Sequence, residues 1–155
     1  MNALVAEDFA VPRELVTEHF RLEPLGERHN SADHAAWTTS IDHIRATPGF
    51  DGRSWPPEQG MSLADNLADL RRHADDFARR TGFTYTVIDR IIGDVIGCVY
   101  IHPDHEGGTG VVVRSWVRQD RAELDDVLHE VVREWLSARW PFPSVSYPGR
   151  DHARI

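Results

Sequence analysis

The sequence has 155 residues, of which 41% are hydrophobic and 27% are charged, and this length and composition suit one globular domain with a sizeable core. The formal net charge of −8 argues against a protein that binds nucleic acid through the phosphate backbone. No apolar run approaches the length that spans a bilayer, and the first residues lack the basic-then-apolar pattern of a secretory signal. We therefore expect a cytoplasmic protein with no membrane partner and no nucleic-acid partner.

The start of the chain predicts an arm followed by a strand. Residues 1–17 show no clear period, and we expect an N-terminal arm that is either mobile or laid along a sheet. One domain is expected over residues 18–150, with a frayed tail at 151–155. The segment His19–Leu25 alternates apolar and polar residues and predicts a strand at or near a sheet edge, because Pro24 cannot donate a ladder hydrogen bond.

A helical region and a long loop come next. Asn30 or Ser31 is placed to cap a helix that reaches Ile44, although threonines in its middle favour two short helices as an alternative. The loop over residues 48–60 is rich in proline and glycine but contains the large rings of Phe50 and Trp55. Such a loop often lies on the body of a domain and carries recognition. The two rings therefore either bind substrate or plug the edge of the core.

The clearest helix begins at Ser62. Its apolar residues from Leu63 to Phe77 follow helical spacing, and Asp65 stands where a capping box places its acidic residue. Gly82 is a suitable residue for the turn that ends the helix. The remaining polar residues predict a solvent-exposed face that carries no site, formed by Arg71, Arg72, His73, Asp75 and Asp76.

The second half of the chain predicts three strands, a helix and a short strand. Phe83–Asp89, Asp94–His102 and Thr109–Arg118 are rich in β-branched and aromatic residues with two-residue alternation. Helical spacing then runs from about Ala122 to Trp140. Ser144–Tyr147 reads as a final short strand. This α/β (α+β) order predicts a mostly antiparallel central sheet with flanking helices.

The order of elements resembles the GCN5-related N-acetyltransferase fold, the acyl-CoA N-acyltransferase-like fold, over nearly the whole chain. The phrase Gly93–Ile101 looks like the family's strand with a glycine near its start, and Ser115–Arg118 looks like the end of its fourth strand. The resemblance implies that acetyl-CoA lies with its thioester and pantetheine arm along the backbone of Ser115, Trp116 and Val117. It further implies that the pyrophosphate lies at the loop that carries Arg118, Gln119 and Arg121.

The chain departs from the family pattern in two places. The segment Arg118–Leu124 lacks the glycines with which the family's phosphate loop closes on the pyrophosphate. Acidic residues at the following helix start would repel that group, since one close like-charge contact is worth roughly a few kcal/mol. The chain also stops soon after Tyr147, where the family usually continues. Tyr147 lies near the place of the family's general acid, and we treat it as a candidate for that role.

The turn His102–Glu106 groups side chains that suit acid–base chemistry. His102 and Glu106 are candidates for the base that takes the proton of an amine. Their spacing matches no well-specified metal site, and we expect no metal. Trp116 shares a strand face with Arg114 and Arg118, so it either contacts a ligand in a cleft or packs beneath Arg114.

Two functional hypotheses remain open from the sequence. The first is an N-acetyltransferase that moves an acetyl group from acetyl-CoA to a small amine. The alternative is a catalytically inactive protein of the same fold that binds a small ligand or forms a homodimer, which the missing glycines and the short C-terminus favour. The two predict different answers to the question of whether acetyl-CoA binds at the opening beside the fourth strand.

Overall fold

The computed structural model describes residues 3–105 and 110–150. Within them, six strands form one sheet in the order β1-β2-β3-β4-β5-β6. Neighbouring strands are antiparallel except β5 and β6, which run parallel, so the predicted mostly antiparallel sheet is confirmed. The strands are β1 (Leu15–Val16), β2 (Phe20–Pro24), β3 (Phe83–Asp89), β4 (Val95–Pro103), β5 (Val111–Val117) and β6 (Val145–Ser146).

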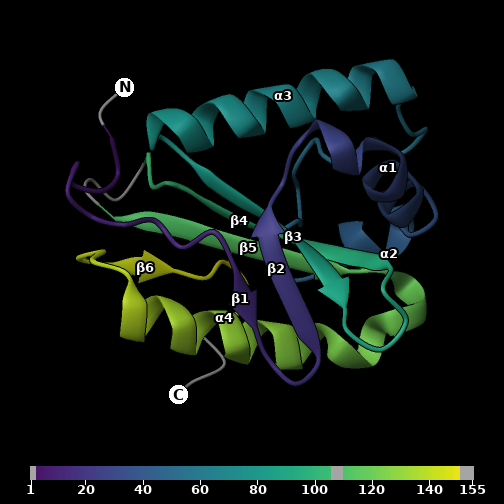
Figure 1. Ribbon diagram of the computed structural model, residues 1–155. Coiled ribbons are helices and arrows are strands. Elements are labelled where there is room, and N and C mark those ends of the chain that lie inside the picture. The colour runs from purple at the N-terminus through teal and green to yellow at the C-terminus, as the bar shows by residue number, and fades with distance from the viewer. Residues whose placement is uncertain (1–2, 106–109, 151–155) are drawn as a thin grey trace.

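Helices cover both faces of this sheet. Figure 1 shows α1, α2 and α3 on one side of the strands and α4 on the other. No described helix is long and apolar enough to cross a membrane. The helical elements are η1 (Glu27–His29), α1 (Asn30–Thr38), α2 (Ile41–Arg45), α3 (Leu63–Arg79), η2 (Gln119–Leu124) and α4 (Asp125–Arg139).

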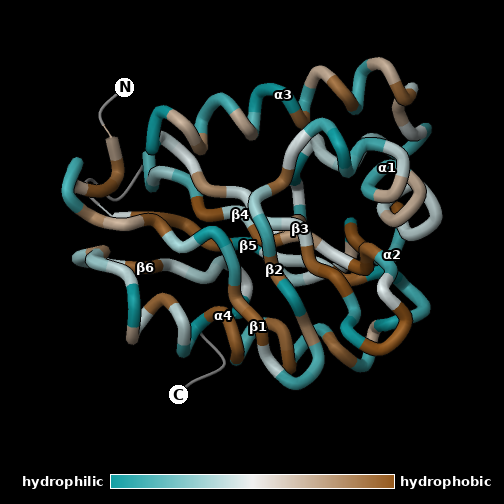
Figure 2. Tube along the Cα trace, in the orientation of Figure 1, coloured by the Kyte–Doolittle hydropathy of each residue, from teal (hydrophilic) through white to brown (hydrophobic). Residues whose placement is uncertain are grey.

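The sheet divides the buried residues into two clusters, one for each face. Alternation along β4 sends Cys98 into the cluster with α1 and α3, and Val99 and Ile101 into the cluster with α4. Trp116 of β5 belongs to the first cluster and Val117 to the second. Figure 2 shows hydrophobic residues along the strands and hydrophilic stretches on the helices outside them. The side of the sheet on which a residue lies therefore follows from its parity in the strand.

The N-terminal segment lies along the sheet. Leu15 pairs with Leu22 of β2 in the antiparallel ladder, and the amide of Leu4 donates to the carbonyl of Arg80 at 2.7 Å. The side chain of Val5 is buried. These contacts fix the segment against the end of α3.

The first predicted helix is present as two short helices, which confirms the alternative given for it, and the last begins later than expected. The first is interrupted, because the hydroxyls of Thr38 and Thr39 donate to the carbonyls of His34 and Ala35, a side-chain bond that weakens helix interiors. The last α-helix begins at Asp125 and not near Ala122. The six residues before it form the tighter η2 turn, in which Arg121 departs from helical backbone angles.

Candidate functional site

A pocket of about 560 Å³ opens on the face of the sheet that carries α1 and α3. Its walls come from α1, the loop 48–60, α3, β4 and β5. Parity places Tyr100 and His102 of β4 on this face, across from Arg114 and Val112 of β5. The predicted substrate residues Phe50 and Trp55 and the predicted base His102 all line this pocket.

Two histidines share one hydroxyl in the wall of the pocket. The Oγ1 atom of Thr84 lies 3.1 Å from Nδ1 of His73 and 3.3 Å from Nε2 of His102. The two imidazole rings stack with centroids 5.9 Å apart and an interplanar angle of 25°. Neighbouring strands supply Thr84 and His102, whereas His73 comes from the middle of α3. We refer to His73, Thr84 and His102 as the histidine relay.

Burial holds both imidazoles of the relay in their neutral forms. The pKa of His73 falls to about 3, mainly because of burial and then because of the charges of His102 and Arg72. The pKa of His102 falls to about 4, again mainly through burial. Asp76 opposes this shift, while Arg114 is among the cations that add to it. At neutral pH both rings are therefore uncharged and able to accept a proton.

Aromatic side chains form the floor beside the relay. The ring of Trp55 packs against Phe50 and Tyr100, each with centroids 6.0 Å away. Beneath them, Trp116 is fully buried and its Nε1 donates to the Tyr100 hydroxyl at 2.9 Å. Burial raises the pKa of Tyr100, so this hydroxyl stays protonated. Trp116 thus supports the pocket wall from below, and Arg114 is anchored by a hydrogen bond from Nε to the carbonyl of Gly49.

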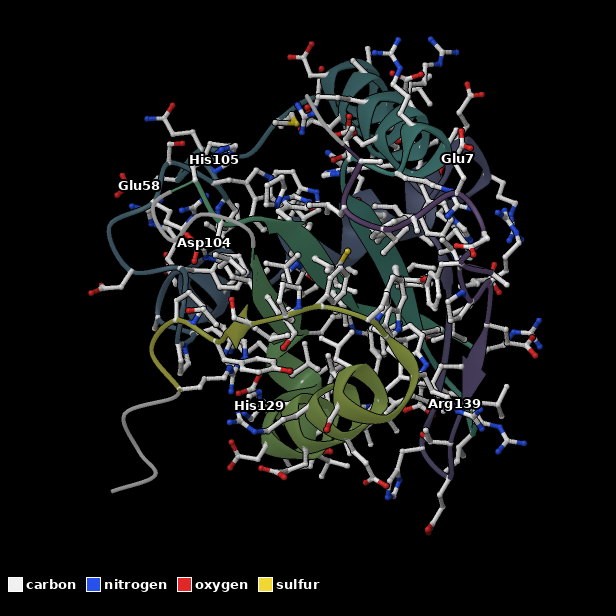
Figure 3. The ribbon with its side chains drawn as sticks, turned by 90° about the vertical axis from the view of Figure 1, so that its left-hand side faces the viewer. Glu7, Glu58, Asp104, His105, His129 and Arg139 are labelled. Atoms are coloured by element: carbon white, nitrogen blue, oxygen red, sulfur yellow. The ribbon has the colours of Figure 1, made fainter. Side chains whose placement is uncertain are left out.

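The other predicted catalytic residues lie away from the relay. Tyr147 is 5% exposed and packs on the α4 face, with its ring 5.1 Å from that of His129 and beneath the guanidinium of Arg133. It therefore lies on the opposite side of the sheet from His102. In Figure 3, His129 lies beside α4, well apart from Asp104 and His105 at the end of the pocket. Glu106 falls outside the described residues.

The predicted donor strand has a free edge over part of its length. Strand β6 pairs with β5 only at Val111 and Val112, and the remainder of β5 has no strand partner on that side within the described chain. Its carbonyl at Ser115 accepts a hydrogen bond from Arg150 at 3.4 Å. The side chains of Ser115 and Val117 are buried. A backbone edge of this kind fits the amide groups of a pantetheine arm, which hydrogen-bond as a strand does.

The junction between β5 and α4 does not fit a pyrophosphate. Arg118 forms two hydrogen bonds of 2.9 Å with Asp120, and Arg121 pairs with Asp89 at 3.3 Å. The amide of Gln119 donates to the hydroxyl of Ser40 at 2.9 Å. The cations and the amide that resemble a phosphate loop are thus already engaged by the protein.

Arg150 lies at the same junction. Its guanidinium forms two hydrogen bonds of 3.0 Å with Asp125, the first residue of α4. The two side chains are 8% and 19% exposed. This pair lies between the free edge of β5 and the start of α4, where the resemblance placed the diphosphate of acetyl-CoA. The residues present therefore fit the thioester arm of acetyl-CoA but not its phosphates.

Part of the pocket does not follow from the sequence. His73 and Asp76 were assigned to a solvent-exposed face of α3, but both line the pocket. The helix presents its apolar stripe to the sheet, and these two residues lie beside that stripe, on the flank that lines the pocket. Their spacing from Leu70 and Phe77 is compatible with such a position. Among the described residues, no group of three or more histidine, cysteine or acidic side chains is arranged to hold a metal ion.

Solved structures with the same fold are acetyltransferases by name. One is the ribosomal-protein-S5-alanine acetyltransferase from Vibrio fischeri, with a TM-score of 0.61, 12% identity, and coverage of 79% of this chain and 66% of that one. Another is the microcin C7 self-immunity acetyltransferase MccE, solved with acetyl-CoA and AMP, with a TM-score of 0.58, 12% identity, and coverage of 83% and 70%. A third is FdhC, a nucleotide-linked sugar acetyltransferase of the same fold family, with a TM-score of 0.63, 11% identity, and coverage of 92% and 78%.

These comparisons show the fold. The chain adopts the GCN5-related N-acetyltransferase fold, as the order of its elements predicted. It spans about two thirds to three quarters of the length of these three proteins. No protein-family model matches the sequence, and no curated protein matches it.

Proposed function

We propose that this protein is an acyltransferase that moves an acetyl group from acetyl-CoA to an amine bound in the pocket. The observation that carries the proposal is the histidine relay, a pair of neutral imidazoles joined by one hydroxyl in the wall of a pocket. The free edge of β5 supports the same function, because it offers backbone groups to the thioester arm. The alternative of a catalytically inactive binding protein or homodimer gains no support from the neighbours, whose names state acetyltransferase activity.

The relay offers one proton acceptor and one donor. The Thr84 hydroxyl can donate to only one of the two ring nitrogens that it meets, so it must accept from the other. The imidazole that donates to Thr84 keeps an unprotonated outer nitrogen, and the other imidazole keeps an outer N–H. With His102 as the donor to Thr84, its Nδ1 is the base. A proton taken there is shared through Thr84 with Nδ1 of His73.

The transfer step balances with these groups. The nitrogen of the amine attacks the thioester carbonyl carbon, a new C–N bond forms, and the C–S bond breaks. The proton lost by the amine goes to His102, and the thiolate that leaves takes up a proton from solvent. The N–H of the second imidazole is available to the carbonyl oxygen as negative charge develops on it. The relay thus needs no charged side chain in its resting state.

Release of free CoA thiol from acetyl-CoA, followed with a thiol reagent in the presence of small primary amines, tests this function. The single cysteine, Cys98, is fully buried and should not consume the reagent. Replacing His102 by Asn should lower kcat by a factor on the order of 10² or more, the usual contribution of a general base. Thr84→Val keeps both rings but disconnects them, so it should lower kcat less than His102→Asn does.

Two results would contradict the function. The first is a His102→Asn protein that turns over as fast as the wild type. The second is the absence of any acetylated amine, by mass spectrometry, after prolonged incubation of folded wild-type protein with millimolar acetyl-CoA. Asp75→Asn is a matched control, because Asp75 lies on the same helix as His73 but is exposed and paired with Arg79 outside the pocket.

A further inference from the structure

A buried carboxylate lies in the wall of the pocket. Asp33 of α1 is 4% exposed and lines the pocket. Its Oδ2 accepts a hydrogen bond from Nδ2 of Asn66 at 3.1 Å. In the part of the chain that the structure describes, no cation pairs with Asp33, and its Oδ1 accepts no hydrogen bond. A buried carboxylate with a single neutral partner is costly to ionise unless a cation joins it.

Aromatic rings surround the same place. Trp37 lies one turn after Asp33 on α1, and its ring is 5.4 Å from that of Trp55. Trp55 in turn packs on Tyr100, which feels the charge of Asp33 across the pocket floor. Asp33, Trp55 and Tyr100 line the same pocket, and a carboxylate together with aromatic rings is a combination that recognises an ammonium group, through one ion pair and cation–π contacts.

The part of the pocket beside the relay contains arginines as well as Asp76 and Asp104. Arg53 and Arg114 both line it, and both depress the pKa of His102. Neither arginine pairs with a carboxylate among the described residues. Positive charge next to the relay favours the neutral form of an amine that lies there. The pocket is thus suited to an uncharged amine at the relay and to an ammonium at Asp33.

We propose that the acceptor is an aliphatic diamine, held by an ion pair between its distal ammonium and Asp33, with its other amine at the histidine relay. The identity of the reacting amine rests on the transferase function proposed above, whereas the ammonium site at Asp33 does not. The distal ammonium of the acceptor thus fixes the orientation of the acceptor in the pocket and lets the protein select diamines over amines with no second cationic group.

The charge state of Asp33 gives the site a pH dependence. Burial is the largest cause that raises the pKa of Asp33, to about 6, while the hydrogen bond from Asn66 opposes this shift. The titratable groups that face it are His29 and His34 from its own segment, Asp69 from α3, and Cys98 and Tyr100 from β4. Binding of an ammonium requires the ionised carboxylate and should weaken as the pH falls through this value.

Calorimetric titration without any acyl donor tests the ammonium site. The probes are 1,4-diaminobutane, the uncharged 1,4-butanediol and the zwitterionic 4-aminobutyrate, all of the same chain length. At pH 7.5 the diamine should bind to the wild type, and Asp33→Asn should weaken it about tenfold or more, while the control Asp75→Asn should stay within about twofold. At pH 5 the wild type should bind the diamine about tenfold more weakly, and Asp33→Asn should show no such change.

Three results would overturn the proposal. They are equal diamine affinity in Asp33→Asn and the wild type, equal binding of the diamine and the diol, and tighter binding of 4-aminobutyrate than of the diamine. If a thermal melt shows that Asp33→Asn is unfolded, the pH series on the wild type and the variant Trp55→Leu take its place. Trp55→Leu should weaken the diamine severalfold. Diamine binding without acetyl transfer would contradict the transferase function alone.

Discussion

Burial and nearby cations both act against protonation of the imidazoles of His73 and His102. Each ring is largely shielded from solvent in the wall of the pocket, and arginines lie nearby, so the neutral form is favoured. A general base with a low pKa is a weak base, but it is not lost to protonation under mildly acidic conditions. Acetyl transfer to the diamine should therefore lose rate below pH 6 through Asp33, before either histidine becomes charged.

The same two pKa values make the stability of the protein depend on pH. Both folded values lie below the unfolded value of about 6.5, so the unfolded chain binds more protons and stability falls as the pH drops from about 6.5 towards 4. Asp33 acts in the opposite sense, because its folded pKa is raised and the folded state gains a proton as the pH falls through about 6. The loss of stability caused by the two histidines should exceed the gain from Asp33, since two rings oppose one carboxylate.

Urea unfolding between pH 4.5 and 7 measures this slope. His102→Asn removes one of the two titrating rings, and the loss of unfolding free energy near pH 5 should become shallower by about 1 kcal/mol per pH unit. His73→Asn should have an effect of the same sign. An unchanged slope in both variants would mean that the rings bind protons equally in the folded and unfolded states, which contradicts the lowering of their pKa values by burial.

At the scale of single elements, β4 and β5 approach each other closely at one glycine. A Cβ atom at Gly97 would lie 2.3 Å from the carbonyl oxygen of Trp116, which is backbone and cannot move without opening the sheet. Gly97→Ala should therefore lower the free energy of unfolding by about 2–3 kcal/mol. Gly26→Ala is the control, because nothing lies within 4 Å of the added atom. Denaturant unfolding that gives equal losses for both variants would refute this account of the strand pair.

The charge of Asp125 at the start of α4 should affect the affinity for acetyl-CoA. Asp125→Asn removes a negative charge and releases the guanidinium of Arg150, so acetyl-CoA should bind about tenfold more tightly. Asp126→Asn removes an equal charge from the next, exposed residue without releasing an arginine, and its effect should be within about threefold. Calorimetry with acetyl-CoA measures both affinities. Equal effects of the two variants would show that Arg150 does not restrict the donor site.

The spacing of apolar residues predicted most of the helices and strands. Each element that packs on a core must repeat its apolar residues with the period of a helix or of a strand. The cap at Ser62 also followed from sequence, and its hydroxyl does accept from the amide of Asp65. The strand Leu15–Val16 did not follow, since its two residues are too few to show alternation. The η2 turn was missed because a 3-10 turn and the first turn of an α-helix have nearly the same sequence preferences.

The candidate site was less predictable than the elements. His102 was singled out because it belongs to a turn that groups several acid–base side chains, and it does line the pocket. His73 and Asp33 were not found, because their burial depends on how α1 and α3 pack together on one face of the sheet, which no local pattern contains. Tyr147 lies on the far side of the sheet from His102. Its direction depends on the register of the two-residue parallel ladder between β5 and β6, and the register of so short a pairing cannot be predicted from sequence.

The proposed sites for the acceptor amine and for acetyl-CoA lie at different parts of the sheet. The acceptor pocket lies on the α1–α3 face, and the free edge of β5 lies beside the start of α4. The thioester and the acceptor amine would meet where β5 is no longer paired with β6, beyond Val112. The part of the β5 edge that lacks a strand partner is therefore the place at which a thioester would approach the relay.

Amide chemical shifts of the labelled protein, titrated separately with acetyl-CoA and with 1,4-diaminobutane, test this arrangement most directly. Acetyl-CoA should shift the amides from Val113 to Val117, along the edge of β5 that β6 leaves unpaired, and that of Arg150, which donates to Ser115. The diamine should shift those of Asp33, Tyr100 and His102. The account predicts both sets of chemical-shift changes at millimolar concentrations of the two ligands. No shifts with acetyl-CoA, or shifts confined to residues far from β5, would contradict it.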